Sequence, residues 1–155
     1  MDTAWWQGIE ATALATALRT SLWAYPLVNA AHILGLALWI GGVMPLGLRL
    51  VGFWPTVPLM LLVRVLAGTS GIGLGLTLVS GGLLFITRAS RYVVSGVFLG
   101  KMALLGLGLI GLVGLSRALR CPPESGSRWL VRLLGGLILV VWPLVLLLGR
   151  LVGYV

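Results

Sequence analysis

The sequence predicts an all-α protein, an integral membrane four-helix up-down bundle with an N-terminal interfacial helix. Hydrophobic residues make up 59% of the 155 residues and charged residues only 9%, whereas an ordinary soluble domain is about 25% charged. Four apolar stretches are long enough to cross the roughly 30 Å of bilayer hydrocarbon. Nearly every charge falls between these stretches. A water-soluble core of this size could not bury so much apolar surface, and we expect the lipid bilayer to be the surrounding partner.

The N-terminal residues, about 3–20, are expected to form an Ala-rich helix that lies at the membrane surface. The paired Trp5 and Trp6 suit the headgroup level, where amphipathic rings prefer to sit. A cleavable secretory signal would need a basic start ahead of an unbroken apolar run. Because Asp2 and Glu10 occupy this region instead, we expect the segment to be retained.

Four membrane spans follow, and short links between them predict an antiparallel up-down arrangement. Pro26 suits a first helical turn, and Arg49 closes the first span; Arg64 and Arg88 bracket the second. We expect the spans at about 26–48, 65–86, 97–115 and 129–148. A polar loop over residues 117–128 joins the last two spans and carries the single cysteine, Cys121, so no intrachain disulfide can form.

The net charge of +8 comes from 11 basic and 3 acidic residues. The basic residues are spread singly through the helix flanks and form no stripe, which argues against nucleic-acid binding. If Lys101 and Arg150 lie within spans, three basic residues remain at one membrane face (Arg19, Arg88, Arg91) and six at the other (Arg49, Arg64, Arg117, Arg120, Arg128, Arg132). The more basic face should be cytoplasmic. We therefore expect a bacterial inner-membrane protein with periplasmic termini.

The chain contains 23 glycines, and in lipid small residues let helix backbones approach closely. Three groups are expected to mark close contacts: Gly71, Gly73 and Gly75; Gly106, Gly108, Gly111 and Gly114; and Gly149 with Gly153. The contacts could be within this chain or with another subunit. This abundance favours a homo-oligomer or a larger membrane-protein complex.

A candidate site begins on the first span, where Asn29, His32, Gly35, Trp39 and Gly42 recur every three or four residues and so share one helix face. A polar side chain on that face should point toward the interior of the bundle. Antiparallel folding brings the start of the first span level with the polar residues near the end of the second span, the start of the third and the end of the fourth. The expected cluster contains Asn29, His32, Ser80, Lys101, Met102 and Arg150.

This cluster has hydrogen-bond donors and positive charge, and no Asp or Glu falls in any span. Proton-coupled transporters and cation channels normally need an intramembrane acid, so that class is disfavoured. An anionic or carbonyl-bearing guest fits better: haem b with its propionates, a quinone, or a lipid phosphate. His32 can donate to a quinone oxygen or act as a metal ligand to haem iron. A second axial ligand would have to be Met102, His32 of another copy, or a partner's residue.

Two simpler interpretations stay open. His32 can be hydrogen-bonded to a neighbouring backbone or hydroxyl group without binding anything, and Lys101 and Arg150 can extend to the lipid headgroups. Copper handling has weaker support, since Met44, Met60, Met102 and Cys121 form no repeated soft-ligand pattern. No Ser/His/Asp grouping, paired carboxylates or phosphate loop is visible, so an enzyme is not expected.

Three segments, Leu18–Gly52, Phe98–Leu112 and Gly149–Val155, resemble a family of small four-span bacterial inner-membrane proteins of unknown function. The resemblance implies that His32, Lys101 and Arg150 match the family's histidine, lysine and closing arginine. Members often carry an acid where this chain has Gly47. The shorter pattern of His32 followed by Trp39, Gly41 and Gly42 is similar to the opening of the copper-resistance D membrane domain, which keeps copper transport as an alternative.

The expected function is that of a non-enzymatic subunit or anchor of a bacterial inner-membrane assembly, linked to respiratory electron transfer through a haem or quinone near His32. Transport of copper or another small solute is one alternative. A purely structural or assembly role is the other, and it predicts that replacing His32 changes only stability.

Overall fold

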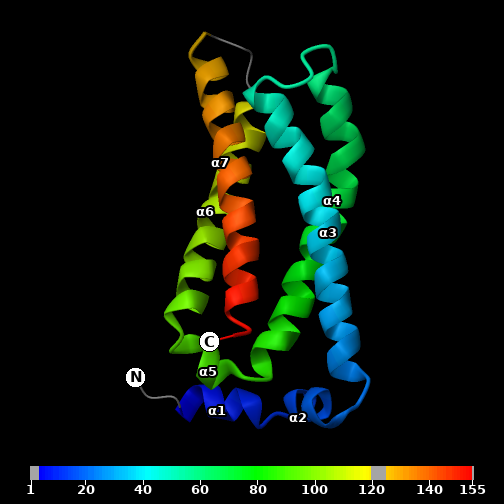
Figure 1. Cartoon of the computed structure of the whole chain (residues 1–155), viewed down its shortest axis with the longest axis vertical. Helices are drawn as coiled ribbons and strands as arrows, with labels where there is room; N and C mark the ends of the chain where they lie inside the picture. Colours follow the sequence, from blue (N-terminus) through cyan, green and yellow to red (C-terminus); the bar gives the residue numbers. More distant parts are fainter. Residues whose placement is uncertain (1–3, 120–124, 155) are drawn as a thin grey trace.

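The computed structural model describes residues 4–119 and 125–154, and within this part every regular element is a helix. Four long helices stand side by side, and three short ones lie at one end of them, where both ends of the chain are also found (Figure 1). The elements are α1 (Ala4–Glu10), α2 (Ala13–Thr20), α3 (Ala24–Val51), α4 (Leu59–Ile86), α5 (Ala89–Val93), α6 (Gly96–Ala118) and α7 (Ser125–Leu151). The predicted all-α four-helix membrane architecture is confirmed.

Each predicted span lies inside one of the four long helices, which extend it by a few residues. α3, α4, α6 and the Trp129–Leu151 part of α7 are all long and apolar enough to cross a membrane. The chain is therefore built as a multi-pass membrane protein. α3 ends where Gly52 adopts a left-handed conformation (φ 118°), which a residue with a Cβ rarely tolerates. The centre of the polar loop, including Cys121, lies outside the described residues.

The N-terminal segment contains two helices, so the expectation of one continuous interfacial helix is wrong in this detail. The chain breaks at Thr12, whose Oγ1 donates to the Ile9 carbonyl oxygen at 2.7 Å and accepts from the Ala15 N–H at 3.4 Å. Thr12 thus ends the first helix and caps the second. Both helices run across the end of the bundle (Figure 1).

Polar contacts hold these two helices against α5 and against the short link between α4 and α5. The Glu10 carboxylate accepts hydrogen bonds from the Ser90 hydroxyl and N–H, both at 2.7 Å. The Arg19 guanidinium donates to the Glu10 carbonyl oxygen at 2.6 Å and to the Thr87 carbonyl oxygen at 3.4 Å. The hydrogen bonds from Ser90 hold the pKa of the Glu10 carboxyl below its usual value.

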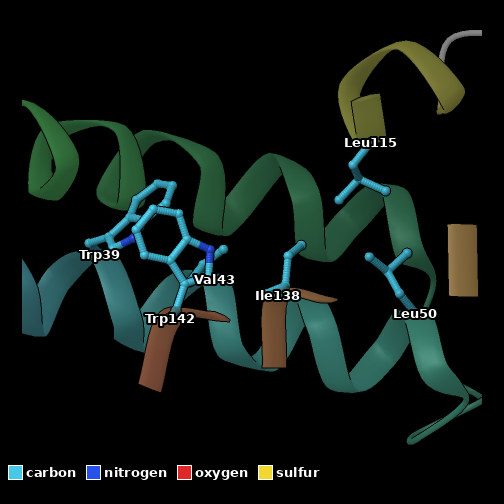
Figure 2. Packing of buried hydrophobic residues seen from close by; sticks show 6 residues of the cluster. All are labelled: Trp39, Val43, Leu50, Leu115, Ile138 and Trp142. Carbon is cyan, nitrogen blue, oxygen red and sulfur yellow. The ribbon is translucent and has the colours of Figure 1, made fainter. Parts of the chain in front are cut away.

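Glycines set the close approach of α3 to α4. A Cβ on Gly73 would lie 2.5 Å from the Trp39 backbone nitrogen, and one on Gly35 would lie 2.8 Å from the Thr77 backbone nitrogen. Only a hydrogen fits at these points, so the two backbones pack almost directly on each other. α7 then packs on α3 through Trp142, whose indole meets that of Trp39 edge to face (Figure 2).

The buried apolar cluster lies where α3, α6 and α7 meet. Its members are Trp39, Val43, Leu50, Leu115, Ile138 and Trp142 (Figure 2). Many of the other large apolar side chains are exposed, as expected for a surface that faces acyl chains. In lipid such exposure has no hydrophobic cost, and the fold is held by packing contact.

The closely packed long-helix pairs are α3–α4, α3–α7 and α6–α7, so α4 and α6 flank an open side of the bundle. For contacts within the chain, this arrangement decides which of the predicted glycines are used. Gly108 and Gly111 do lie against α7 side chains, whereas a Cβ on Gly71, Gly75 or Gly106 would meet nothing within 4 Å. At the last three positions no helix among the described residues packs closely.

Candidate ligand-binding cavity

His32 projects from α3 onto α4, where its ring is fixed by hydrogen bonds. Its Nδ1 atom lies 3.1 Å from the Thr77 carbonyl oxygen and 3.0 Å from Ser80 Oγ. Because a carbonyl oxygen can only accept, Nδ1 carries a proton. The Ser80 hydroxyl donates to the Leu76 carbonyl oxygen within its own helix, so its oxygen is free to accept from His32 as well.

This arrangement leaves the other ring nitrogen available. In the neutral imidazole only one nitrogen carries a proton, so Nε2 keeps its lone pair. Within the part of the chain that the structure describes, Nε2 has no hydrogen-bond partner. Histidines that bind metals or accept hydrogen bonds from ligands are commonly oriented in this way, with the opposite N–H bound to a backbone carbonyl. The orientation of His32 therefore leaves Nε2 available to accept a hydrogen bond or to coordinate a metal ion.

His32 lines a cavity of about 550 Å³, called here the inner cavity. Its wall is almost entirely apolar, with contributions from Trp39, Trp142 and Leu105 among others. Polar or charged side chains enter it at His32, Lys101 and Thr77. A mostly apolar cavity with a few convergent polar groups is typical of a small-molecule site.

A second, more polar cavity of about 300 Å³ adjoins the first and is called the outer cavity. Asn29 and Arg150 line it, and His32 and Lys101 line both cavities. The neighbouring rings of Phe85, Tyr92 and Phe98 are stacked, with centroids 5.4 to 6.2 Å apart. His32 and Lys101 thus stand at the boundary between a polar and an apolar space.

Lys101 reaches this boundary from α6, across the bundle from His32. A Cβ on Gly149 would lie 3.4 Å from the Lys101 Cε atom, so glycine at that position of α7 makes room for the lysine side chain. Among the described residues Lys101 has no hydrogen-bond or ion-pair partner, and no acidic side chain lines either cavity. An ammonium in an acid-free cavity favours a guest that offers anionic or carbonyl oxygens.

The six predicted site residues all fall in this region, in different positions. His32 and Lys101 line both cavities, Met102 lines the inner one, and Asn29 and Arg150 line the outer one. Ser80 is buried behind His32 and holds its ring. Arg150 also donates to the Tyr154 hydroxyl at 2.7 Å, with its guanidinium carbon 4.9 Å from the centre of that ring.

Sequence reasoning missed several residues of this region. Thr77 anchors His32 through its backbone carbonyl oxygen, and no residue type reveals such a contact. A Cβ on Gly81 would lie 3.1 Å from the His32 Cε1 atom, so the glycine allows the imidazole ring to pack directly against α4. Trp142 and Phe98 contribute apolar wall, and in a uniformly apolar helix nothing in the sequence distinguishes them.

Three buried donor atoms in residues of the inner-cavity wall lack hydrogen-bond partners among the described residues: Trp39 Nε1, Trp142 Nε1 and Thr77 Oγ1. Unpaired buried donors are uncommon in folded proteins. They add three potential hydrogen-bond donors to the residues of the inner-cavity wall.

The prediction of His32 as a metal ligand stays a prediction. Among residues 4–119 and 125–154, no three His, Cys, Asp or Glu side chains come together. A copper site built only from these side-chain types is thus not found within this part of the chain, whereas a single histidine can still bind the iron of a macrocycle that supplies its own nitrogens.

Comparison with known proteins gives no further constraint, and the predicted resemblances to a four-span family and to the copper-resistance D domain stay predictions. No protein-family model matches the chain, and no curated protein or solved structure matches it.

Proposed function

We propose that this membrane protein binds a quinone at the boundary between its two cavities, as a non-enzymatic subunit of an electron-transfer assembly. One observation carries the proposal: His32 Nε2 and the Lys101 ammonium, both without partners among the described residues, converge on the same cavity walls. An acceptor and a donor are thereby offered together in a largely apolar space.

The two groups suit the two redox forms of a quinone. The Lys101 ammonium can donate to a quinone carbonyl oxygen, and His32 Nε2 can accept from a quinol hydroxyl. The apolar walls contributed by Leu36, Leu74 and Leu105 match a flat ring. The protein's part is to bind and orient this ring, with electrons exchanged by partner proteins.

The proposed setting is a bacterial inner membrane with periplasmic termini, as the basic residues favour. Gly68, Gly75 and Gly82 on α4 are exposed, and a Cβ at any of these three positions would meet nothing within 4 Å. Such positions let another membrane helix approach closely, which supports assembly with further copies or with a larger complex.

Haem b is the second candidate, favoured by one specific observation. The thioether-bearing Met102 and the imidazole of His32 both line the inner cavity, from α6 and α3. Histidine and methionine together are a known axial pair for haem iron. In this version Lys101 would face a propionate instead of a quinone oxygen.

A titration distinguishes these candidates. Purified protein in lipid nanodiscs is titrated with a short-tailed benzoquinone while tryptophan emission is followed, because Trp39 and Trp142 lie in the cavity wall. We expect saturable quenching. The affinity for the quinone should be at least about tenfold lower in His32→Phe and in Lys101→Met, because each variant loses one charged or buried hydrogen bond. Arg64→Met, which removes an exposed cation from the far end of α4, is the matched control and should bind normally.

Equal quenching in all four proteins would contradict the quinone proposal. An absorption spectrum of the dithionite-reduced protein, isolated with its native partners, tests the haem version. Soret and alpha bands that disappear in His32→Phe would favour haem over quinone.

A further inference from the structure

A third cavity, of about 380 Å³, lies farther along the open side of the bundle and is called here the groove. α3, α4 and α6 line it, and it shares Trp39 and Leu74 with the inner cavity. The outer cavity, the inner cavity and the groove therefore follow one another along the bundle. Each adjoins the next through residues that line both.

The polarity of this path falls along its length. The outer cavity carries Asn29, Lys101 and Arg150, whereas the groove is apolar apart from Ser70 and Ser116. Both serine hydroxyls have ordinary structural explanations: Ser70 lies against Gly42, and Ser116 donates to the Val113 carbonyl oxygen at 2.8 Å. A path that is polar at one end and apolar beyond it matches an amphiphile with one head and one long tail.

The groove is also open toward the surrounding lipid. α4 and α6 are not closely packed against each other, and the groove residues Gly71 and Val113 are exposed. A Cβ on Gly71 would meet nothing within 4 Å. A hydrocarbon tail can therefore enter the groove sideways from the bilayer, without passing through either end of the bundle.

Resting on the quinone site proposed above, we infer that the ligand is a long-tailed isoprenoid quinone whose tail passes Trp39 and lies in the groove between α4 and α6. The head is held at His32 and Lys101. Lipid tails are as apolar as the groove, so moving the isoprenoid chain between them brings no hydrophobic gain. The tail must contribute through dispersion contact with fixed walls, which adds up over many atom pairs.

The test compares quinones that share one head group and differ only in tail: none, two isoprenoid units, or a long natural tail. Binding is measured by tryptophan quenching in nanodiscs, with each ligand expressed as a mole fraction of the lipid so that partitioning into the bilayer cancels. We expect the long-tailed quinone to bind at least about fivefold more tightly than the tailless one, from the summed dispersion contacts.

Two variants of α4 localise the effect. Gly71→Leu adds a side chain to the groove lining at a position where its Cβ meets nothing within 4 Å. It should remove the advantage of the long tail while leaving the tailless quinone unaffected. Gly68→Leu makes the same change one helical turn away, at a glycine that also has open space but lines none of the three cavities. It should keep the advantage.

The outcomes separate this inference from the proposed function. Equal affinity for all tails, sensitive to His32→Phe, overturns the tail site and leaves the quinone site standing. Absence of saturable binding by any quinone removes both. A Gly71→Cys variant in a Cys121→Ser background that forms disulfide-linked dimers in the membrane would show a second copy in the groove, and it too would overturn the inference.

Discussion

The indole rings of Trp39 and Trp142 meet edge to face, with centroids 4.8 Å apart and planes inclined by 75°. The pair joins α3 to α7 and also forms part of the inner-cavity wall. Because the same two side chains hold the bundle and shape the cavity, stability and ligand binding are coupled at this point.

Trp142→Leu should therefore destabilise the bundle by about 2 kcal/mol. This is less than the roughly 3–5 kcal/mol that Trp→Ala costs in soluble cores, because leucine keeps part of the volume and the transfer contribution is missing in lipid. Reversible unfolding in mixed detergent micelles measures this change. Trp129→Leu is the matched control, since that indole is 67% exposed on the same helix. Equal losses in both variants would show that the pair has no special role.

Gly73→Ala should be among the most damaging small changes, with a loss of about 3 kcal/mol or more, as expected where a backbone must shift. The added methyl would lie 2.5 Å from the Trp39 backbone nitrogen and would force α3 and α4 apart. Gly75→Ala, two residues along the same helix, meets nothing within 4 Å and should leave the unfolding midpoint unchanged. The comparison fails if the two variants unfold alike.

Gly81→Ala should weaken quinone binding about threefold without removing any polar group. This loss of affinity is smaller than the loss expected when one hydrogen bond is removed. Its Cβ would lie 3.1 Å from the His32 Cε1 atom, and the ring cannot retreat freely because Nδ1 is held by Thr77 and Ser80. The quenching titration described above measures the change, with Gly68→Ala as the control. Unchanged affinity in Gly81→Ala would mean that ring position is not critical.

Docking of α1 and α2 should depend on pH through Glu10. Because the carboxyl pKa is lowered in the folded state, its contribution is complete above the ordinary carboxyl range and is lost as pH falls through the lowered value. The hydrogen-exchange protection of residues 4–20, which compares the measured rate with the intrinsic amide rate at the same pH, should fall on acidification in the native protein. Glu10→Gln should show low protection at every pH, and Gln7→Ala, exposed on the same helix, should behave as the native protein does. Protection that changes neither with pH nor in Glu10→Gln would show that other contacts hold these helices.

Much of the site was predictable from spacing alone. His32, Gly35, Trp39 and Gly42 do share the packed side of α3, because helical periodicity fixes relative facing within one helix. Asn29, one turn earlier, is exposed at the edge of the outer cavity. Antiparallel folding then placed Lys101 at the same depth as His32, since rise per residue and span length set that depth.

The sequence by itself determined the four spans, the interfacial segment and the level at which polar groups meet, because crossing hydrocarbon requires long apolar helices and disfavours charges that face the acyl chains. Only the tertiary structure decided which helix faces pack, that α4 and α6 leave one side open, and that Gly73 is pressed against α3 while Gly71 faces free space. The physical reason is that lipid is as apolar as a helix interface. Hydrophobicity thus marks every face of these helices alike, and shape complementarity, which no single position encodes, selects among them.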